Sequence, residues 1–251
     1  MRTLNFNLII TILVYKLFAV YGGDLPPEIQ NCKSTDNDEC IARTIEEIFK
    51  RYPNGNADFG MPSVAALNFT NLKISRPNPS SSIQINFEFI KCTMYGLENV
   101  KILHASGFDK ELKKPQLDIL IPKLRITGYY ESTGKLLLLP LNGKGNGDIE
   151  LRESKFHASG KLEIEKRNGK NYGKIKSVKA AIEPKQVLVK VENIFNGNPI
   201  LSETINDVVN ENWRDVWSEL QEGINNAMEM MITQIMSGIF NELSIDDFYS
   251  D

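Results

Sequence analysis

Histidines, which most often do acid–base and metal chemistry, are few in this 251-residue chain. His104 and His157 are its only histidines, and neither lies near the acidic or serine motifs that build a catalytic triad. The stretch GKGNG at 143–147 has glycines, but it lacks the lysine and the serine or threonine that end a phosphate-binding loop. We therefore expect a non-enzymatic protein with no catalytic residues, no metal site and no cofactor.

The three cysteines offer redox chemistry instead. Cys32 and Cys40 flank a polar, turn-rich stretch that can bend back on itself, so we predict a disulfide worth roughly 2–3 kcal/mol in the chain-entropy model. Metal binding is the rival interpretation, but neither histidine lies near the pair. Cys92 lies in an apolar, strand-like run, and we expect it to be a buried and unreactive thiol.

The first residues predict export from the cell. Residues 8–20 form an apolar run that is too short for a membrane-spanning helix, which needs about 20 residues, and Lys16 interrupts it. Small residues then follow at the spacing that a signal peptidase accepts. We predict a signal peptide at 1–22 and one secreted domain at 23–251, with a membrane anchor as the alternative.

The composition favours an ordinary folded domain. An apolar content of 41% is typical of globular proteins, and nothing resembling a linker divides the chain. A formal net charge of −3 argues against nucleic acid or an anionic lipid surface as the partner. No later segment is long and apolar enough to span a bilayer, so we expect no stable membrane insertion. Asn68 heads the one allowed N-x-S/T sequon and is a candidate glycosylation site.

Three hydrophobic patterns follow one another along the chain. An amphipathic helix is expected at 38–52. Alternating strands follow, for example at Val187, Val189 and Val191, with RNGK and LNGKG as expected hairpin tips. From Ser202 to Leu243 no proline interrupts a helical pattern that is apolar around most of its circumference.

These patterns predict how the elements pack. A strand region that is apolar on one face must cover something, and a helix that is apolar almost all round must be covered. We therefore predict an α+β fold in which a strongly curved antiparallel sheet wraps around a long carboxy-terminal helix.

The order of the motifs resembles the insect takeout and juvenile-hormone-binding protein family over essentially the whole mature chain. The resemblance implies a single TULIP-like module with an internal hydrophobic tunnel for a lipid-like molecule. The hormone carriers usually have a second disulfide in their later half, whereas this chain has no cysteine after Cys92, so it is more similar to the takeout branch. The resemblance rests on the pair Cys32–Cys40, GMPSVAALNF at 60–69, YGLENVKIL at 95–103, PKLRITGYY at 122–130, LLLLPLNGKGNGDIEL at 136–151 and ENIFNGNPILSETINDVVNENWRDVW at 192–217.

The resemblance also implies a set of ligand-binding residues. Tyr130 occupies the family's G-x-Y position, where the hormone carriers direct a tyrosine hydroxyl toward the polar group of the ligand. The alternative is a ring in the core with its hydroxyl in water. The methionines of the carboxy-terminal helix are either core filling or adaptable ligand contacts. The candidate ligand set is Tyr130, Tyr129, Leu138, Trp213, Met228, Met231 and Ile235.

We interpret the chain as a monomeric extracellular carrier, in haemolymph or a similar fluid, that sequesters small hydrophobic molecules. Juvenile hormone, other terpenoids and fatty acids are the expected ligand classes. The alternative is a takeout-type signalling protein in circadian or feeding regulation that acts through a cell-surface receptor, with any bound lipid only structural. A hydrolase is disfavoured because the catalytic groups are missing.

The secreted protein should be cleaved next to Gly22. Amino-terminal sequencing of protein recovered from the medium should start between Gly23 and Leu25, because the peptidase cuts after the small residues that follow the apolar run. A membrane-bound product that retains Met1 would contradict the signal-peptide interpretation.

Overall fold

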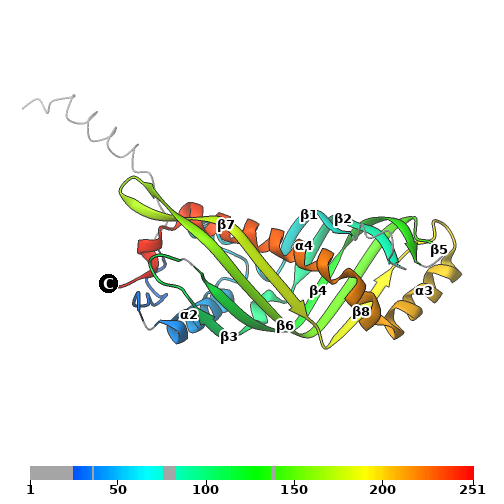
Figure 1. Ribbon diagram of the computed structural model, residues 1–251, viewed down its shortest axis with the longest axis horizontal. Coiled ribbons are helices and arrows are strands. Elements are labelled where there is room, and N and C mark those ends of the chain that lie inside the picture. The colour runs from blue at the N-terminus through cyan, green and yellow to red at the C-terminus, as the bar shows by residue number, and fades with distance from the viewer. Residues whose placement is uncertain (1–24, 36, 76–82, 113, 137–138) are drawn as a thin grey trace, which may run out of the picture.

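The computed structural model describes residues 25–35, 37–75, 83–112, 114–136 and 139–251. The predicted signal peptide and the candidate residue Leu138 lie outside the described residues. In the described part, an antiparallel sheet curls around one long helix, and shorter helices lie at the two ends of the elongated molecule (Figure 1). The predicted α+β class, with a curved sheet wrapped around a carboxy-terminal helix, is confirmed.

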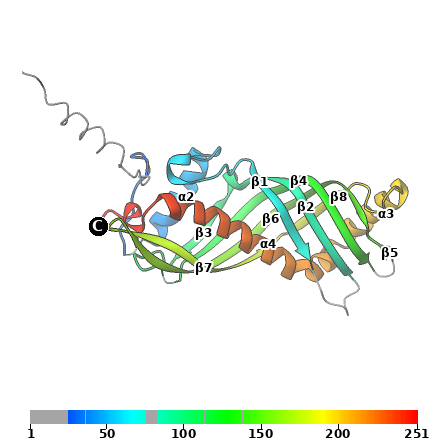
Figure 2. The ribbon, with the colours of Figure 1, turned by 90° about the horizontal axis from the view of Figure 1, so that it is seen from above.

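Within the described residues the sheet has eight strands, in the order β1-β2-β4-β6-β7, with β3 and β5 paired to β4 and β8 paired to β6. The two longest strands, β4 and β6, form its centre and run diagonally along the molecule (Figure 2). The strands are β1 (Leu67–Ser75), β2 (Ile83–Tyr95), β3 (Lys101–Ser106), β4 (Gln116–Leu136), β5 (Leu139–Pro140), β6 (Gly143–Arg167), β7 (Lys170–Glu183) and β8 (Gln186–Val191).

One of the two predicted hairpin tips is confirmed. Asn168 and Gly169, both with positive φ, make the two-residue turn between β6 and β7. The tip predicted at LNGKG is wrong, because Gly143 is already the first residue of β6 and pairs with Ser132 of β4. The glycines of that motif serve the inner face of the sheet, as described below.

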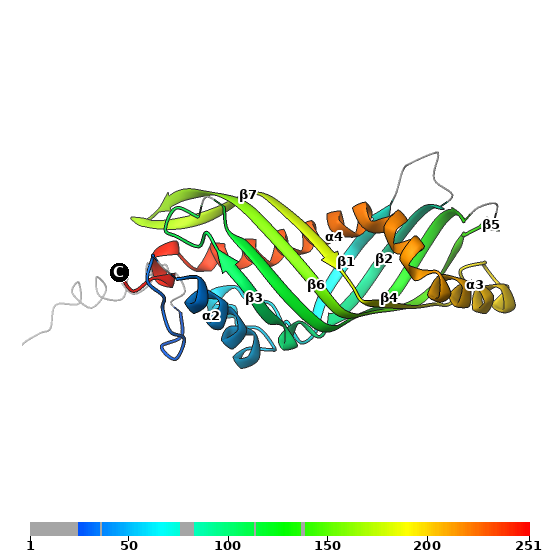
Figure 3. The ribbon, with the colours of Figure 1, turned by 60° about the horizontal axis from the view of Figure 1, so that its bottom comes forward.

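The predicted carboxy-terminal helix is divided in two. α3 ends at Glu211 and α4 begins at Trp213, with Asn212 between them at φ −111° and ψ 26°. The two helices have different tasks: α3 lies along the edge strand β8, whereas α4 crosses the concave face of the sheet (Figure 3). The helices are α2 (Asp38–Arg51), α3 (Pro199–Glu211) and α4 (Trp213–Glu242), with short 3-10 turns η1 (Ala57–Phe59), η2 (Leu97–Asn99) and η3 (Ile245–Phe248).

α4 contacts both β1 and β7, so it closes the open side of the curled sheet. Two glycines let its backbone come close to other segments. A Cβ at Gly223 would lie 2.7 Å from the carbonyl oxygen of Ser75, and a Cβ at Gly238 would lie 2.8 Å from that of Gly60. Both positions therefore need glycine for close packing rather than for flexibility. None of the helices in the described part of the chain is long and apolar enough to cross a membrane.

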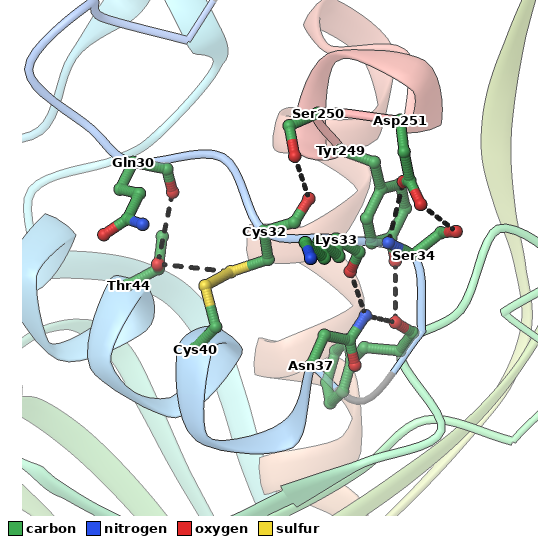
Figure 4. Close-up of a disulfide and its surroundings, with 11 residues drawn as sticks. Gln30, Cys32, Lys33, Ser34, Asn37, Cys40, Thr44, Tyr249, Ser250 and Asp251 are labelled. Atoms are coloured by element: carbon green, nitrogen blue, oxygen red, sulfur yellow. Dashed lines mark hydrogen bonds between the residues drawn. A yellow bond between two sulfur atoms is a disulfide. The ribbon is translucent and has the colours of Figure 1, made fainter.

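A disulfide links Cys32 to Cys40 (Figure 4). Cys40 belongs to α2, which lies at the end of the molecule away from α3 (Figure 1). The carbonyl oxygen of Cys32 accepts a hydrogen bond from the Ser250 backbone N–H at 2.9 Å. The Ser34 backbone N–H and hydroxyl donate to the Asp251 carboxylate at 2.8 and 3.1 Å. The predicted bridge is confirmed and ties Cys32 to α2, while the hydrogen bonds hold the start of the described chain against its last residues.

Cys92 is the free cysteine, as predicted, and its side chain is buried in the main core. Burial raises the pKa of its thiol to about 11. Because the thiolate is the reactive form, this thiol is inert at neutral pH.

Gly60→Ala should destabilise the protein strongly, because Gly60 has φ +66° and a Cβ there would lie 2.2 Å from the carbonyl oxygen of Gly238. Gly169→Ala is the matched control: φ is +85°, yet nothing lies within 4 Å of the added carbon. The control should lose about 1–2 kcal/mol from the left-handed conformation alone. Gly60→Ala should lose roughly 1–3 kcal/mol more through overpacking, measured by urea unfolding. Equal losses would contradict the close contact between η1 and α4.

Candidate functional site

An apolar cavity of about 140 Å³ lies where α3 and the first turns of α4 cover the sheet. Strands β1, β2, β6 and β8 form its floor and walls, and the two helices cover it. All of its lining residues are apolar: Ile74, Ile85, Phe87, Leu141, Ile149, Val187, Val189, Val191, Ile194, Ile205, Val209, Trp213, Val216, Trp217, Leu220 and Ile224.

Ordinary periodicities bring these side chains together. On β8, valines at every second position face inward, because side chains alternate across a strand. On α3, Ile205 and Val209 are four residues apart and share one helical face. On α4, Trp213 and Trp217 repeat the same spacing, and they are the two tryptophans of the chain. The cavity therefore forms where three apolar faces converge.

This cavity can hold a molecule only by burying its apolar surface. Its walls offer no charged side chain and almost no polar surface, so a molecule inside would be held by the transfer of apolar area out of water. A dry cavity of roughly 150 Å³ accepts a benzene-sized molecule, whereas sites for larger ligands usually enclose about 300–1,000 Å³. A ligand larger than a small ring therefore requires some lining side chains, or α3, to shift.

Tyr130 belongs to the wall of this region but does not reach into the cavity. Its side chain is fully buried, and its ring stacks on that of Phe87, which lines the cavity, with 4.7 Å between ring centroids. Its hydroxyl donates to the backbone carbonyl oxygen of Glu192 at 2.6 Å. Burial, and to a lesser extent the charge of Glu192, raise the pKa of the phenol. Neither expected arrangement is seen, because the hydroxyl points to neither ligand space nor water.

The other predicted ligand residues are spread over different places. Trp213 lines the cavity. Met228 and Met231 are buried further along α4, where they fill the main core, and neither is among the lining residues. Ile235 borders a shallow depression beside β1 instead. The structure therefore groups only Trp213 of these four with the cavity.

The position of Tyr129 differs from its expected place in the ligand-binding set. Its side chain is 43% exposed, and it lies on the outer face of the sheet because successive strand residues point to opposite sides. It cannot contact a molecule in the cavity without a change of strand register.

The glycines of GKGNG make room for the aromatic residues behind the cavity. Gly145 and Gly147 pair with Tyr130 and Gly128 of β4. A Cβ at Gly147 would lie 3.0 Å from the ring of Phe89, and a Cβ at Gly145 would lie 2.7 Å from the carbonyl oxygen of Glu192. The glycines of this motif, which superficially suggests a phosphate loop, are thus needed for close packing inside the curled sheet.

A larger hollow of about 800 Å³ lies on the outer face of the sheet, but it has different chemistry. Several of its charged side chains form ion pairs: Arg125 donates to Asp148 at 2.5 Å, and Lys123 lies 2.7 Å from Glu150. The amide of Asn146 donates to the Glu192 carboxylate at 3.0 Å. This hydrated, ion-paired surface does not suit an apolar molecule.

Sequence reasoning missed most of the cavity. The alternating valines of β8 predict a strand, yet nothing in the pattern distinguishes a valine that contacts a ligand from one that packs in the core. The usable signal was the combination of that strand with the Trp213–Trp217 spacing. Among the described residues, no group of three or more His, Cys, Asp or Glu side chains is placed to hold a metal ion.

A sheet curled around one helix, with an apolar cavity between them, defines a protein that binds small hydrophobic molecules. Residues 8–250 match the family model of the haemolymph juvenile hormone binding protein. The chain belongs to this family, whose members are binding proteins rather than enzymes.

Individual relatives agree with this membership. The circadian clock-controlled protein daywake of Drosophila melanogaster is 25% identical over 231 residues, which cover 89% of this chain and 88% of that protein. The daywake protein of Drosophila yakuba is 25% identical over 229 residues, with the same coverage of 89% and 88%. The crystal structure of Epiphyas postvittana Takeout 1 has a TM-score of 0.69 at 20% identity, covering 89% of this chain and 100% of that chain, and supports the fold.

Tyr130→Phe should act on stability rather than on ligand choice. The variant keeps the stacked ring but leaves the Glu192 carbonyl without its buried donor, so the free energy of unfolding should fall by about 1–3 kcal/mol. Ligands with and without a polar group should bind the variant equally well. A selective loss of affinity for polar ligands would place the hydroxyl in the ligand space instead.

Proposed function

We propose that this protein is a secreted, monomeric carrier that sequesters a small hydrophobic molecule, with the apolar end of the ligand in the cavity between β8, α3 and α4. The observation that carries the proposal is the lining, which is apolar at every position. Terpenoids, including juvenile hormone, and fatty acids are the ligand classes that suit it.

The lining also determines which end of a ligand enters. Each buried methylene contributes roughly 0.8 kcal/mol, whereas a polar group left without a partner in the cavity would cost about 1–3 kcal/mol. A ligand with one polar group therefore places its hydrocarbon end in the cavity. Chain length and shape set the affinity, and polar contacts outside the cavity tune the choice among ligands.

The proposal includes extracellular delivery. It assigns residues 1–22 to a signal peptide, and a disulfide between Cys32 and Cys40 suits an oxidising compartment. It also assigns a glycan to Asn68, whose side chain is exposed on the edge strand β1, with its amide oxygen accepting a hydrogen bond from Thr93.

A second candidate function is extracellular signalling in clock regulation through a cell-surface receptor. The similarity to proteins named as circadian clock-controlled favours it. In that case bound lipid is a structural component, and ligand exchange has no role. The two functions differ in whether the cavity binds added ligands reversibly and with a dependence on ligand size.

The two tryptophans provide the test, because both line the cavity and no other tryptophan contributes to the emission. Titration with saturated fatty acids of increasing length should change the emission. The affinity should rise roughly fourfold per added methylene until the accessible space is full.

Two neighbouring valines give a matched control. Val209→Phe fills the cavity and should weaken binding by about tenfold or more, whereas Val208→Phe adds the same ring to a side chain that is 41% exposed and should change nothing. Emission that responds to no ligand, or affinity equally affected by both variants, would contradict the carrier function.

A further inference from the structure

The first turn of α3 exposes apolar side chains at one end of the molecule. Ile200 is 76% exposed and Leu201 is 43% exposed, and they are adjacent in the chain. α3 lies at the end opposite to α2 and the carboxy terminus (Figures 1 and 3). Two neighbouring large apolar side chains are exposed to water in this position, and a contact with another surface would bury them favourably.

The chain around these residues has an unusual charge pattern. Charged residues make up 24% of the sequence, yet residues 193–202 contain none. Glu203, Asp207 and Glu211 follow at intervals of four residues, so the acidic side chains begin only behind the first turn of α3. No lysine or arginine occurs between Lys190 and Arg214. The segment 193–202 is therefore uncharged, with an acidic zone of Glu203, Asp207 and Glu211 behind it.

The opposite face of the same helix lines the ligand cavity. Ile205 and Val209 line the cavity, so α3, together with the first turns of α4, separates the cavity from the outside. Its attachment to the sheet combines this apolar contact with four side-chain hydrogen bonds. The Asn206 amide exchanges two hydrogen bonds with the backbone of Val191, both 2.9 Å, and the Asn210 amide exchanges two with Val189, at 2.7 and 2.8 Å.

These amide pairs occupy the free backbone groups of the edge strand β8. Water can satisfy the same groups, because they lie at the edge of the sheet and not in its interior. A displacement of α3 away from β8 would thus open the cavity without leaving backbone groups unsatisfied.

We propose that the tip of α3, defined as residues 193–202 with Ile200 and Leu201 exposed, docks reversibly on a zwitterionic lipid surface, where the apolar ligand enters or leaves the cavity beneath the helix. The ligand-exchange part rests on the proposed carrier function, whereas the docking part does not. Docking and ligand exchange are connected because the exposed tip and the cavity-lining face belong to the same helix, α3.

A lipid surface fits these observations better than a protein partner. A stable protein interface of standard size buries about 800 Å² on each side, far more than the two exposed side chains of the tip supply. A lipid interface accepts a small apolar insertion without a complementary shape, and the resulting association is weak and reversible. The acidic zone disfavours an anionic bilayer, and the absence of basic residues in the tip leaves no group to select one.

The first experiment uses ligand-free protein and sedimentation with phosphatidylcholine vesicles. Ile200→Ser combined with Leu201→Ser should reduce the bound fraction by about tenfold, since both insertions are lost. Leu103→Ser is the matched control, because Leu103 is 57% exposed on β3, and its variant should bind vesicles like the parent protein. Phosphatidylserine added to the vesicles should not strengthen the association.

The second experiment follows transfer of parinaric acid from loaded protein to acceptor vesicles, with energy transfer from the tryptophans as the signal. Docking predicts a transfer rate that rises with vesicle concentration for the parent and not for the double variant, while both bind parinaric acid equally in solution. Vesicle binding that is unchanged in the double variant would overturn the proposal and would favour a protein partner for the tip. Absence of parinaric acid binding would instead count against the carrier function, and the sedimentation result would still decide the docking.

Discussion

The structure depends on one requirement: a sheet that is apolar on one face must have that face covered. A single helix of 30 residues, α4, meets it by lying across the concave face and reaching both β1 and β7. Glycines on its inner face, such as Gly145 and Gly147, let backbone and aromatic rings approach closely within the curled sheet. A flatter sheet would need more than one helix to cover it, and a shorter helix would leave part of the sheet in water.

The fit between helix and sheet changes along α4, and this change creates the cavity. Near its carboxy-terminal end α4 is in backbone contact with η1 at Gly238, and in its middle it comes close to β1 at Gly223. Met228 and Met231 fill the interior between these two contacts. At its amino-terminal end, Trp213 and Trp217 lie between helix and sheet, and both line the cavity. The break at Asn212 then turns the chain into α3, which covers the remaining opening.

Much of the fold could be predicted from the sequence, since it follows from local rules. Strand alternation, the helix at 38–52, the disulfide and the turn at Asn168–Gly169 all depend on residues that are close in the chain. The site was predicted less well, because it depends on contacts between distant residues. The hydroxyl of Tyr130 bonds to Glu192, which is 62 residues away. The break at Asn212 accompanies the hydrogen bonds between asparagine side chains of α3 and the backbone of β8. No proline in the sequence indicates this break. Trp213 lines the cavity, whereas Met228 and Met231 of α4 have the same apolar character and belong to the main core.

The central claim is that the apolar end of a ligand lies between β8 and the junction of α3 with α4. A crystal structure with a fatty acid that carries bromine on its terminal carbon tests this claim directly, since the anomalous signal locates one atom. The account predicts a single peak inside the cavity, in contact with Trp213 and Val191. A peak on the outer face of the sheet beside Arg125, or in the core beside Met228, would contradict it.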